Sequence, residues 1–155
     1  MRCGGRKSPP PLNGMEGAMA ETIRVVDYFY IETPDKPGEG IRALSALKEA
    51  GVNLFAFTGF PKGRRAQLDF FPTDPAAFRA VAKKNRWKVV GPKKGFLIEG
   101  DDHIGAVADL LAKLAEAKVN LTATDAVCAG AGRYGVILWV KPRDVKRAAK
   151  AFGIT

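Results

Sequence analysis

Two short stretches of the sequence carry the same kinds of polar group at the same spacing. The first set consists of Asp35, Lys36, Pro37, Gly38 and Asn53, and the second of Asp102, His103, Gly105 and Asn120. In both sets, eighteen positions separate the aspartate from the asparagine. A carboxylate accepts hydrogen bonds from an ammonium group, and an amide both donates and accepts. The free backbone N–H groups at the start of a helix attract a carboxylate. Each set therefore suits a zwitterion such as a free amino acid.

Other kinds of chemistry find little support in the residue types. His103 is the only histidine, and the two cysteines, Cys3 and Cys128, lie far apart in the sequence. No Cys/His cluster has the spacing of metal ligands, and no nucleophile has an evident base. The stretch "GAGRYG" lies between two predicted strands, so we interpret it as a hairpin loop and not a phosphate cradle. We expect no catalysis, no metal and no cofactor.

An internal repeat predicts the elements that position these groups. With an offset of 67 residues, thirteen of twenty-eight positions from Phe29 to Ala56 are identical to those from Phe96 to Ala123. The apolar patterns predict strands over 25–32, 52–57, 66–71 and 87–90 in the first copy, and over 95–99, 119–124 and 134–140 in the second. Helices are predicted around 41–48, 74–85, 104–114 and 143–153. The order is βαββαβ in the first copy.

The predicted fold class is α+β, with two ferredoxin-like βαββαβ units in tandem. We divide the chain into a disordered tail (residues 1–21), a first unit (22–92) and a second unit (93–155). The second unit lacks most of its fourth strand, which leaves a sheet edge uncovered. The long first strand, the other unit or another chain could cover that edge. The last option predicts a homodimer.

Three finer expectations follow from the same patterns. Alternation along 52–57 predicts that Val52, Leu54 and Ala56 share one face of a strand. Helical spacing relates Ile41 to Leu44, Leu47 and Lys48, and relates Ile104 to Val107, Leu111 and Leu114, which predicts that each set lies along one side of a helix. In the βαββαβ order we expect Asn53 to lie beside the turn that holds Asp35, and Gly38 to admit a closely approaching ligand.

The stretch "TPDKPGEGIRALSALKEAGVNL" resembles the ACT domain, a small regulatory module of enzymes of amino-acid biosynthesis. The motif is an acidic or amide residue, a basic residue, Pro-Gly, a helix, and then Gly-aliphatic-Asn-aliphatic. The second copy matches with two departures, since Ile104 replaces Pro37 and Lys118 replaces Gly51. The resemblance covers residues 25–155 and implies a stand-alone regulatory sensor that binds an amino acid at an interface between units. It implies ligand contacts from the nine residues of the two sets, and a regulated enzyme as partner.

Two alternatives stay open. One is a ligand-free module that binds a partner protein. The other is an RNA-binding protein, because the net charge is +9 and Phe55, Phe57, Phe70 and Phe71 lie on predicted strands. Exposed aromatic residues on the third strand would favour RNA, which we otherwise do not expect. The apolar runs are too short for a membrane helix, and two cysteines make no disulfide framework. We therefore expect a cytoplasmic protein.

Overall fold

The computed structural model describes residues 21–155, so nearly all of the predicted tail lies outside the described residues. Six strands and four α-helices form a mixed α+β fold, as predicted. The strands are β1 (Thr22–Pro34), β2 (Leu54–Lys62), β3 (Arg65–Pro72), β4 (Val90–Asp101), β5 (Leu121–Gly130) and β6 (Arg133–Val140). The helices are α1 (Glu39–Glu49), α2 (Pro75–Lys84), α3 (Ala106–Glu116) and α4 (Val145–Ala151), and a 3₁₀ turn, η1, spans Pro142–Asp144.

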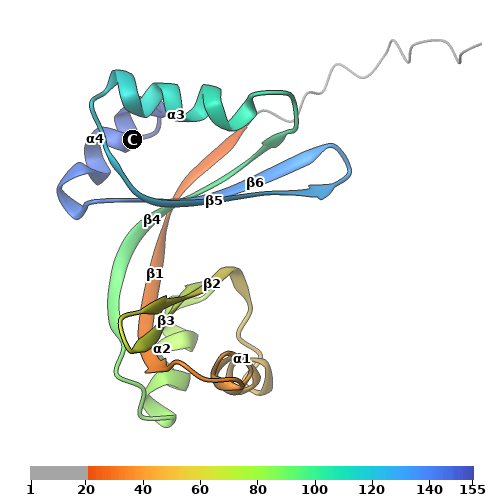
Figure 1. Ribbon diagram of the computed structural model, residues 1–155, viewed down its shortest axis with the longest axis vertical. Helices are drawn as coiled ribbons and strands as arrows, with labels where there is room; N and C mark the ends of the chain where they lie inside the picture. The colour runs from red at the N-terminus through yellow and green to blue at the C-terminus, as the bar shows by residue number, and fades with distance from the viewer. Residues whose placement is uncertain (1–20) are drawn as a thin grey trace, which may run out of the picture.

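All six strands belong to one antiparallel sheet in the order β2-β3-β1-β4-β6-β5. The long strands β1 and β4 run through its centre, with α1 and α2 near one end and α3 and α4 near the other (Figure 1). Edge strands β2 and β5 therefore come from opposite halves of the chain.

The central strands each pair with two different neighbours. Residues 22–28 of β1 pair with residues 93–99 of β4, whereas residues 29–34 of β1 pair with β3. The separate strand predicted over 87–90 is wrong, because residues 87–89 form no regular structure. Strand β4 instead begins at Val90 and continues through the predicted strand at 95–99, so the predicted boundary at 92/93 lies inside it. The sequence predicts an uncovered sheet edge in the second unit. The first residues of β1 pair with that edge, on the side of β4 opposite β6, so the long first strand covers it.

A β-bulge changes the predicted faces of β2. The pairing of β2 with β3 shifts between Leu54 and Ala56. As a result Leu54 and Phe57 pack against the same core, while Ala56 packs on the other face of the sheet. The predicted shared face of Leu54 and Ala56 is therefore wrong, because an extra residue breaks the two-residue period. Strand β5 has the same irregularity between Leu121 and Ala123, at the aligned positions.

Three clusters of buried side chains hold the sheet and helices together. One lies under α1 and α2 around Phe29, Phe70 and Phe78, and one under α3 and α4 around Phe96, Leu110 and Leu138. The third contains Tyr28, Phe71 and Trp139, which all come from strands. It marks the face of the sheet that no helix covers.

The helix faces differ from the prediction at two isoleucines. Helix α1 buries Ala43 and Leu47, but Ile41 is 65% exposed. Helix α3 begins at Ala106, so Ile104 belongs to the preceding turn and is fully exposed. The longest described helices, α1 and α3, have 11 residues each, which is too short to cross a bilayer.

Candidate functional site

The turn from Asp35 to Gly38 joins β1 to α1 and is open to solvent. Gly38 is the N-cap residue with φ +94°, a conformation that favours glycine, and nothing lies within 4 Å of the place where its Cβ would be. The glycine is thus explained by the backbone conformation, and no neighbouring group in the described chain approaches it. Asp35 is exposed and makes no ion pair or hydrogen bond with the described residues. Lys36 lies 4.0 Å from Glu39.

Asn53 lies at the other end of the sheet from this turn. Pro34, at the end of β1, pairs with Arg65, which in turn pairs with Lys62 at the far end of β2. Asn53 precedes Leu54, so the length of β2 separates it from the turn, about 25 Å at ~3.3 Å per residue. The expectation that Asn53 lies beside Asp35 is wrong, because β1 and β2 run in the same direction on either side of β3.

The second turn has the same placement but different contacts. The side chain of Asp102 accepts a hydrogen bond from Cys128 Sγ at 3.3 Å, and its backbone N–H donates to Gly132. His103 Nδ1 lies 3.1 Å from the carbonyl oxygen of Ile104. Gly105 caps α3 with φ +87°, as Gly38 caps α1. Asn120 precedes β5, which again begins at the end of the sheet opposite its turn.

The helix-free face of the sheet contains a groove that the sequence patterns did not reveal. It consists of two pockets, of about 530 Å³ and 460 Å³, and both are lined by Thr58 of β2 and Asp125 of β5. Such volumes fall within the range of small-molecule sites, ~300–1,000 Å³. Residues from both halves of the chain line each pocket. We call the larger one the polar pocket and the smaller one the apolar pocket.

The polar pocket brings together a buried carboxylate and two lysines. Asp69 of β3 is 3% exposed and accepts a hydrogen bond of 2.7 Å from Gln67 Nε2. Lys62 is engaged with Glu32 at 2.8 Å and with Gln67 at 3.0 Å. Lys93 of β4 instead lies over the rings of Tyr28 and Tyr30, at 5.8 and 5.6 Å, and pairs with no carboxylate of the described chain.

Burial dominates the electrostatics of this pocket. It raises the pKa of Asp69, against the lowering effects of the Gln67 hydrogen bond and of Lys93 and Lys62. The negative charge of Asp125, which lines the same pocket, raises the pKa of Asp69 further. Burial and the charge of Asp69 raise the pKa of Tyr28 to about 12.

A buried donor without a partner also lines the polar pocket. Trp139 of β6 is 5% exposed, and its indole Nε1 makes no hydrogen bond with the described residues. Buried donors of this kind are rare in native proteins, and a bound ligand is one group that can accept from them. The tryptophan is held in place by ring contacts with Phe71 at 5.5 Å and Tyr28 at 6.3 Å.

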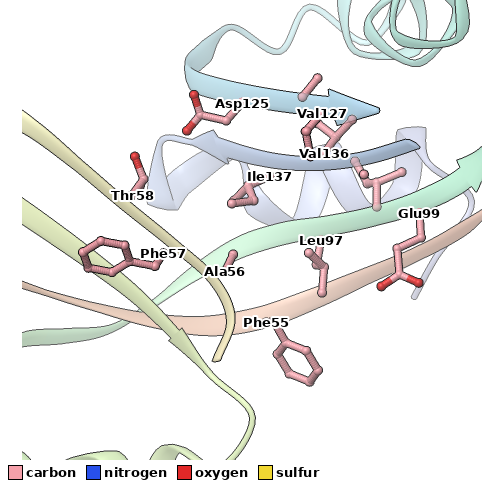
Figure 2. Close-up of a pocket in the computed structure, with 13 residues that line it drawn as sticks. Phe55, Ala56, Phe57, Thr58, Leu97, Glu99, Asp125, Val127, Val136 and Ile137 are labelled. Atoms are coloured by element: carbon pink, nitrogen blue, oxygen red, sulfur yellow. The ribbon is translucent and has the colours of Figure 1, made fainter. Parts of the chain in front are cut away.

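The apolar pocket continues the groove beyond Thr58 and Asp125. Figure 2 shows these two side chains at one end of the pocket, with Ile137, Leu97 and Val127 extending away from them. Phe55 is 41% exposed and Val127 is 62% exposed. The charge of Glu99 is matched by Arg24, 3.6 Å away, and Arg24 also covers the ring of Phe55.

Parts of the two pockets come from aligned positions of the repeat, although Asp69 and its aligned residue Trp139 both line the polar pocket. With the offset of 67, Tyr30 corresponds to Leu97 and Thr58 to Asp125. After the β-hairpin, where the second copy is three residues longer, Gln67 corresponds to Ile137 and Asp69 to Trp139. Asp69 and Gln67 could have been found in the sequence by looking for polar residues whose aligned residues in the other copy are apolar. Lys93 carries no such signal.

The RNA-binding alternative is not supported by the aromatic residues of the third strand. Phe70 and Phe71 of β3 are fully buried, so neither is available to stack on a base.

Comparison with known proteins supports the fold. No family model matches the sequence, and no curated protein matches it either. Among solved structures, protein BT0572 from Bacteroides thetaiotaomicron is 18% identical, with a TM-score of 0.73 over 84% of this chain and 88% of that one. The regulatory subunit of aspartate kinase from Thermus thermophilus is 16% identical, with a TM-score of 0.62 over 89% of this chain and 97% of that one. The corresponding subunit from Thermus flavus is 16% identical, with a TM-score of 0.56 over 88% and 96%. At these identities the likeness establishes the fold, which is α+β, ferredoxin-like and ACT-like.

Proposed function

We propose that this protein is a regulatory protein that binds a free amino acid between its two halves, residues 22–92 and 93–155. The observation that carries the proposal is the polar pocket. It offers the carboxylates of Asp69 and Asp125 to an ammonium group, and the unpaired ammonium of Lys93 to a carboxylate. These charges come from β3, β5 and β4, so a zwitterion held by all three would link the halves.

Such a link is a physical basis for regulation. A ligand shifts a conformational equilibrium only if it prefers one arrangement, and one that bridges the halves favours the arrangement that brings the three charges together. A partner enzyme that contacts either half would sense the change. The fold shared with regulatory subunits of aspartate kinase supports this role. We propose no catalytic activity for the chain itself.

The turn residues form a second proposed contact for an amino acid. Asp35 is unpaired, and the first backbone N–H groups of α1 have no helical partner. Because Asn53 is distant from this turn in one chain, a site that uses both requires a second copy. We propose the same arrangement for Asp102, His103, Gly105 and Asn120, where the bond from Cys128 to Asp102 makes binding weaker.

A thermal-shift screen against the twenty amino acids tests the function. A ligand that binds only the folded protein adds ~2.7 kcal/mol at a concentration of 100 times its Kd. We expect at least one amino acid to raise Tm, and Lys93→Gln to reduce that response at least tenfold in apparent Kd. Lys94→Gln is a matched control, since Lys94 pairs with Asp27 and lines neither pocket.

The same screen separates the two proposed contacts and the remaining alternative. A response lost in Asp35→Ala but kept in Lys93→Gln would move the site to the turn. No response from any amino acid, with a normal Tm for the free protein, would contradict the proposal and favour a ligand-free interaction module.

A further inference from the structure

The two pockets of the groove meet, and their chemistry changes where they meet. Thr58 and Asp125 line both, so a molecule that passes between these side chains contacts both pockets (Figure 2). On one side lie the buried Asp69, the unpaired Lys93 and the indole Nε1 of Trp139. On the other side most lining residues are apolar, and the charged side chains there are Asp125, at the junction, and Glu99.

The polar pocket matches the head group of an α-amino acid. Two carboxylates, Asp69 and Asp125, line the pocket and can accept from an ammonium group. Lys93 and the indole N–H of Trp139 are both donors without an acceptor in the described chain, and a carboxylate accepts from both. The charges are therefore complementary to both ends of a zwitterion.

The apolar pocket matches a large hydrocarbon side chain. Ile137, Leu97 and Val127 line it beyond Thr58 and Asp125, and the partly exposed Phe55 also lines it. Of its two acidic side chains, Glu99 is already paired with Arg24, and Asp125 lies at the junction with the polar pocket. A polar ligand side chain placed against Leu97, Ile137 and Val127 would lose water without gaining a partner from these residues.

We propose that the groove binds a single amino acid with a large apolar side chain, with its head group in the polar pocket and its side chain in the apolar pocket. The inference rests on the proposed function and adds the location and the class of ligand. It also explains why the aligned pockets differ, because each end of the ligand requires a different surface. The chain then has one groove site, although its sequence is repeated.

Calorimetric titration of the full chain with a small series of ligands tests the inference. Leucine and asparagine have similar shapes but opposite polarity, glycine carries the head group alone, and phenylalanine tests the size limit. We expect leucine or phenylalanine to bind at least tenfold more tightly than asparagine or glycine, because only these two bury apolar surface. Aspartate and lysine should bind no better than glycine.

Variants in each pocket locate the ligand. Lys93→Gln should weaken the binding of leucine at least tenfold. Val127→Thr replaces one methyl group by a hydroxyl group at a largely exposed position, so the fold is preserved, and binding should weaken about fourfold. Val90→Thr is the control, since Val90 is 44% exposed and lines neither pocket.

The outcomes separate this inference from the proposed function. Tighter binding of asparagine, aspartate or lysine than of leucine would overturn the inference and leave an amino-acid regulator. Leucine binding that is unchanged in both Lys93→Gln and Val127→Thr would also overturn it, because the site would lie outside the groove. Absence of binding by every amino acid would overturn the inference and the proposed function together.

Discussion

Several positions that line the polar pocket align with positions that line the apolar pocket, yet only the polar pocket carries buried charge. In the polar pocket Asp69 and Gln67 form a hydrogen-bonded pair, whereas the aligned positions in the second copy carry Trp139 and Ile137. Both copies keep the strands, the β-bulges and the glycine-capped helices. The comparison teaches that the repeat preserves the backbone, while the side chains on the helix-free face have diverged. Substitutions at aligned positions can test how far this asymmetry matters.

The largest effect is expected where Tyr28 aligns with Gly95. The ring of Phe71 stacks on Tyr28 at 5.1 Å and also covers Gly95, where a Cβ atom would lie 2.8 Å from the ring. We expect Gly95→Ala to destabilise the protein by ~1–3 kcal/mol, as overpacking of a core does. Thermal unfolding measures the change. Gly135→Ala is the control, because its Cβ would meet nothing closer than 3.9 Å. Equal stability of the two variants would contradict the packing argument.

The next effect concerns the buried charge of the polar pocket. The pKa of Asp69 is raised in the folded state, so the folded protein holds the proton more tightly than the unfolded chain. Stability is therefore lost as the pH rises from the unfolded pKa, ~3.9, through the folded pKa. Asp69→Asn removes this loss, and its oxygen can still accept from Gln67. We expect the variant to be more stable than the parent at pH 7 by ~1 kcal/mol, and the gain to shrink towards pH 4.

Denaturant unfolding at several pH values checks this prediction, and ligand titration complements it. The same variant should bind the amino acid at least tenfold more weakly, because an ion-pair partner of the ammonium group is lost. A variant that is less stable at pH 7 would show that the charge of Asp69 is already compensated within the chain.

A smaller effect is expected at the ends of the first helix of each copy. Gly51 and Lys118 are aligned and both adopt a left-handed conformation, with φ +71° and +54°. Their N–H groups donate to the equivalent carbonyls of Lys48 and Ala115. Since this conformation costs ~1–2 kcal/mol for a residue with a side chain, and glycine costs ~0.5–1 kcal/mol in entropy, Lys118→Gly should stabilise the protein by a few tenths to ~1 kcal/mol. Gly51→Lys should destabilise it by a similar amount, and thermal unfolding of both tests the pair.

The smallest effect is expected at the centre of the β1–β4 pairing. Asp27 pairs with Lys94, its own aligned residue, and Lys94 Nζ lies 2.5 Å from Asp27 Oδ1. Because Lys94 is exposed, Lys94→Gln should lower the free energy of unfolding by only ~0.2–1 kcal/mol. Lys94→Asp should lower it further, since two like charges would then face each other. If the two variants are equally stable, the opposite charges of Asp27 and Lys94 do not contribute to the stability of the protein.

The elements and their order follow from local features of the sequence. The offset of 67 residues, the apolar periods and the turn glycines predicted the α+β class and most strands and helices, because these signals are local. Asp74, predicted as an N-cap, accepts from the N–H groups of Ala76 and Ala77 as expected. Local signals failed where a bulge shifted the period, as at Leu54 and Ala56, and where α3 began two residues after Ile104.

Tertiary structure alone decided how the two copies join and where charge is buried. No local pattern shows that β4 is one strand across 90–101. The sequence pattern is equally consistent with two separate strands, one that ends the first copy and one that begins the second. The pairing of β4 with β1 makes it one strand, because a continuous β4 forms backbone hydrogen bonds with β1 on one side and with β6 on the other. The same pairing places Lys93 beside Asp69 and Trp139, three residues that are distant in sequence. Asp35 and Asn53 illustrate the converse. Both copies repeat their spacing, but α1 carries the chain from the end of β1 to the opposite end of the sheet, where β2 begins.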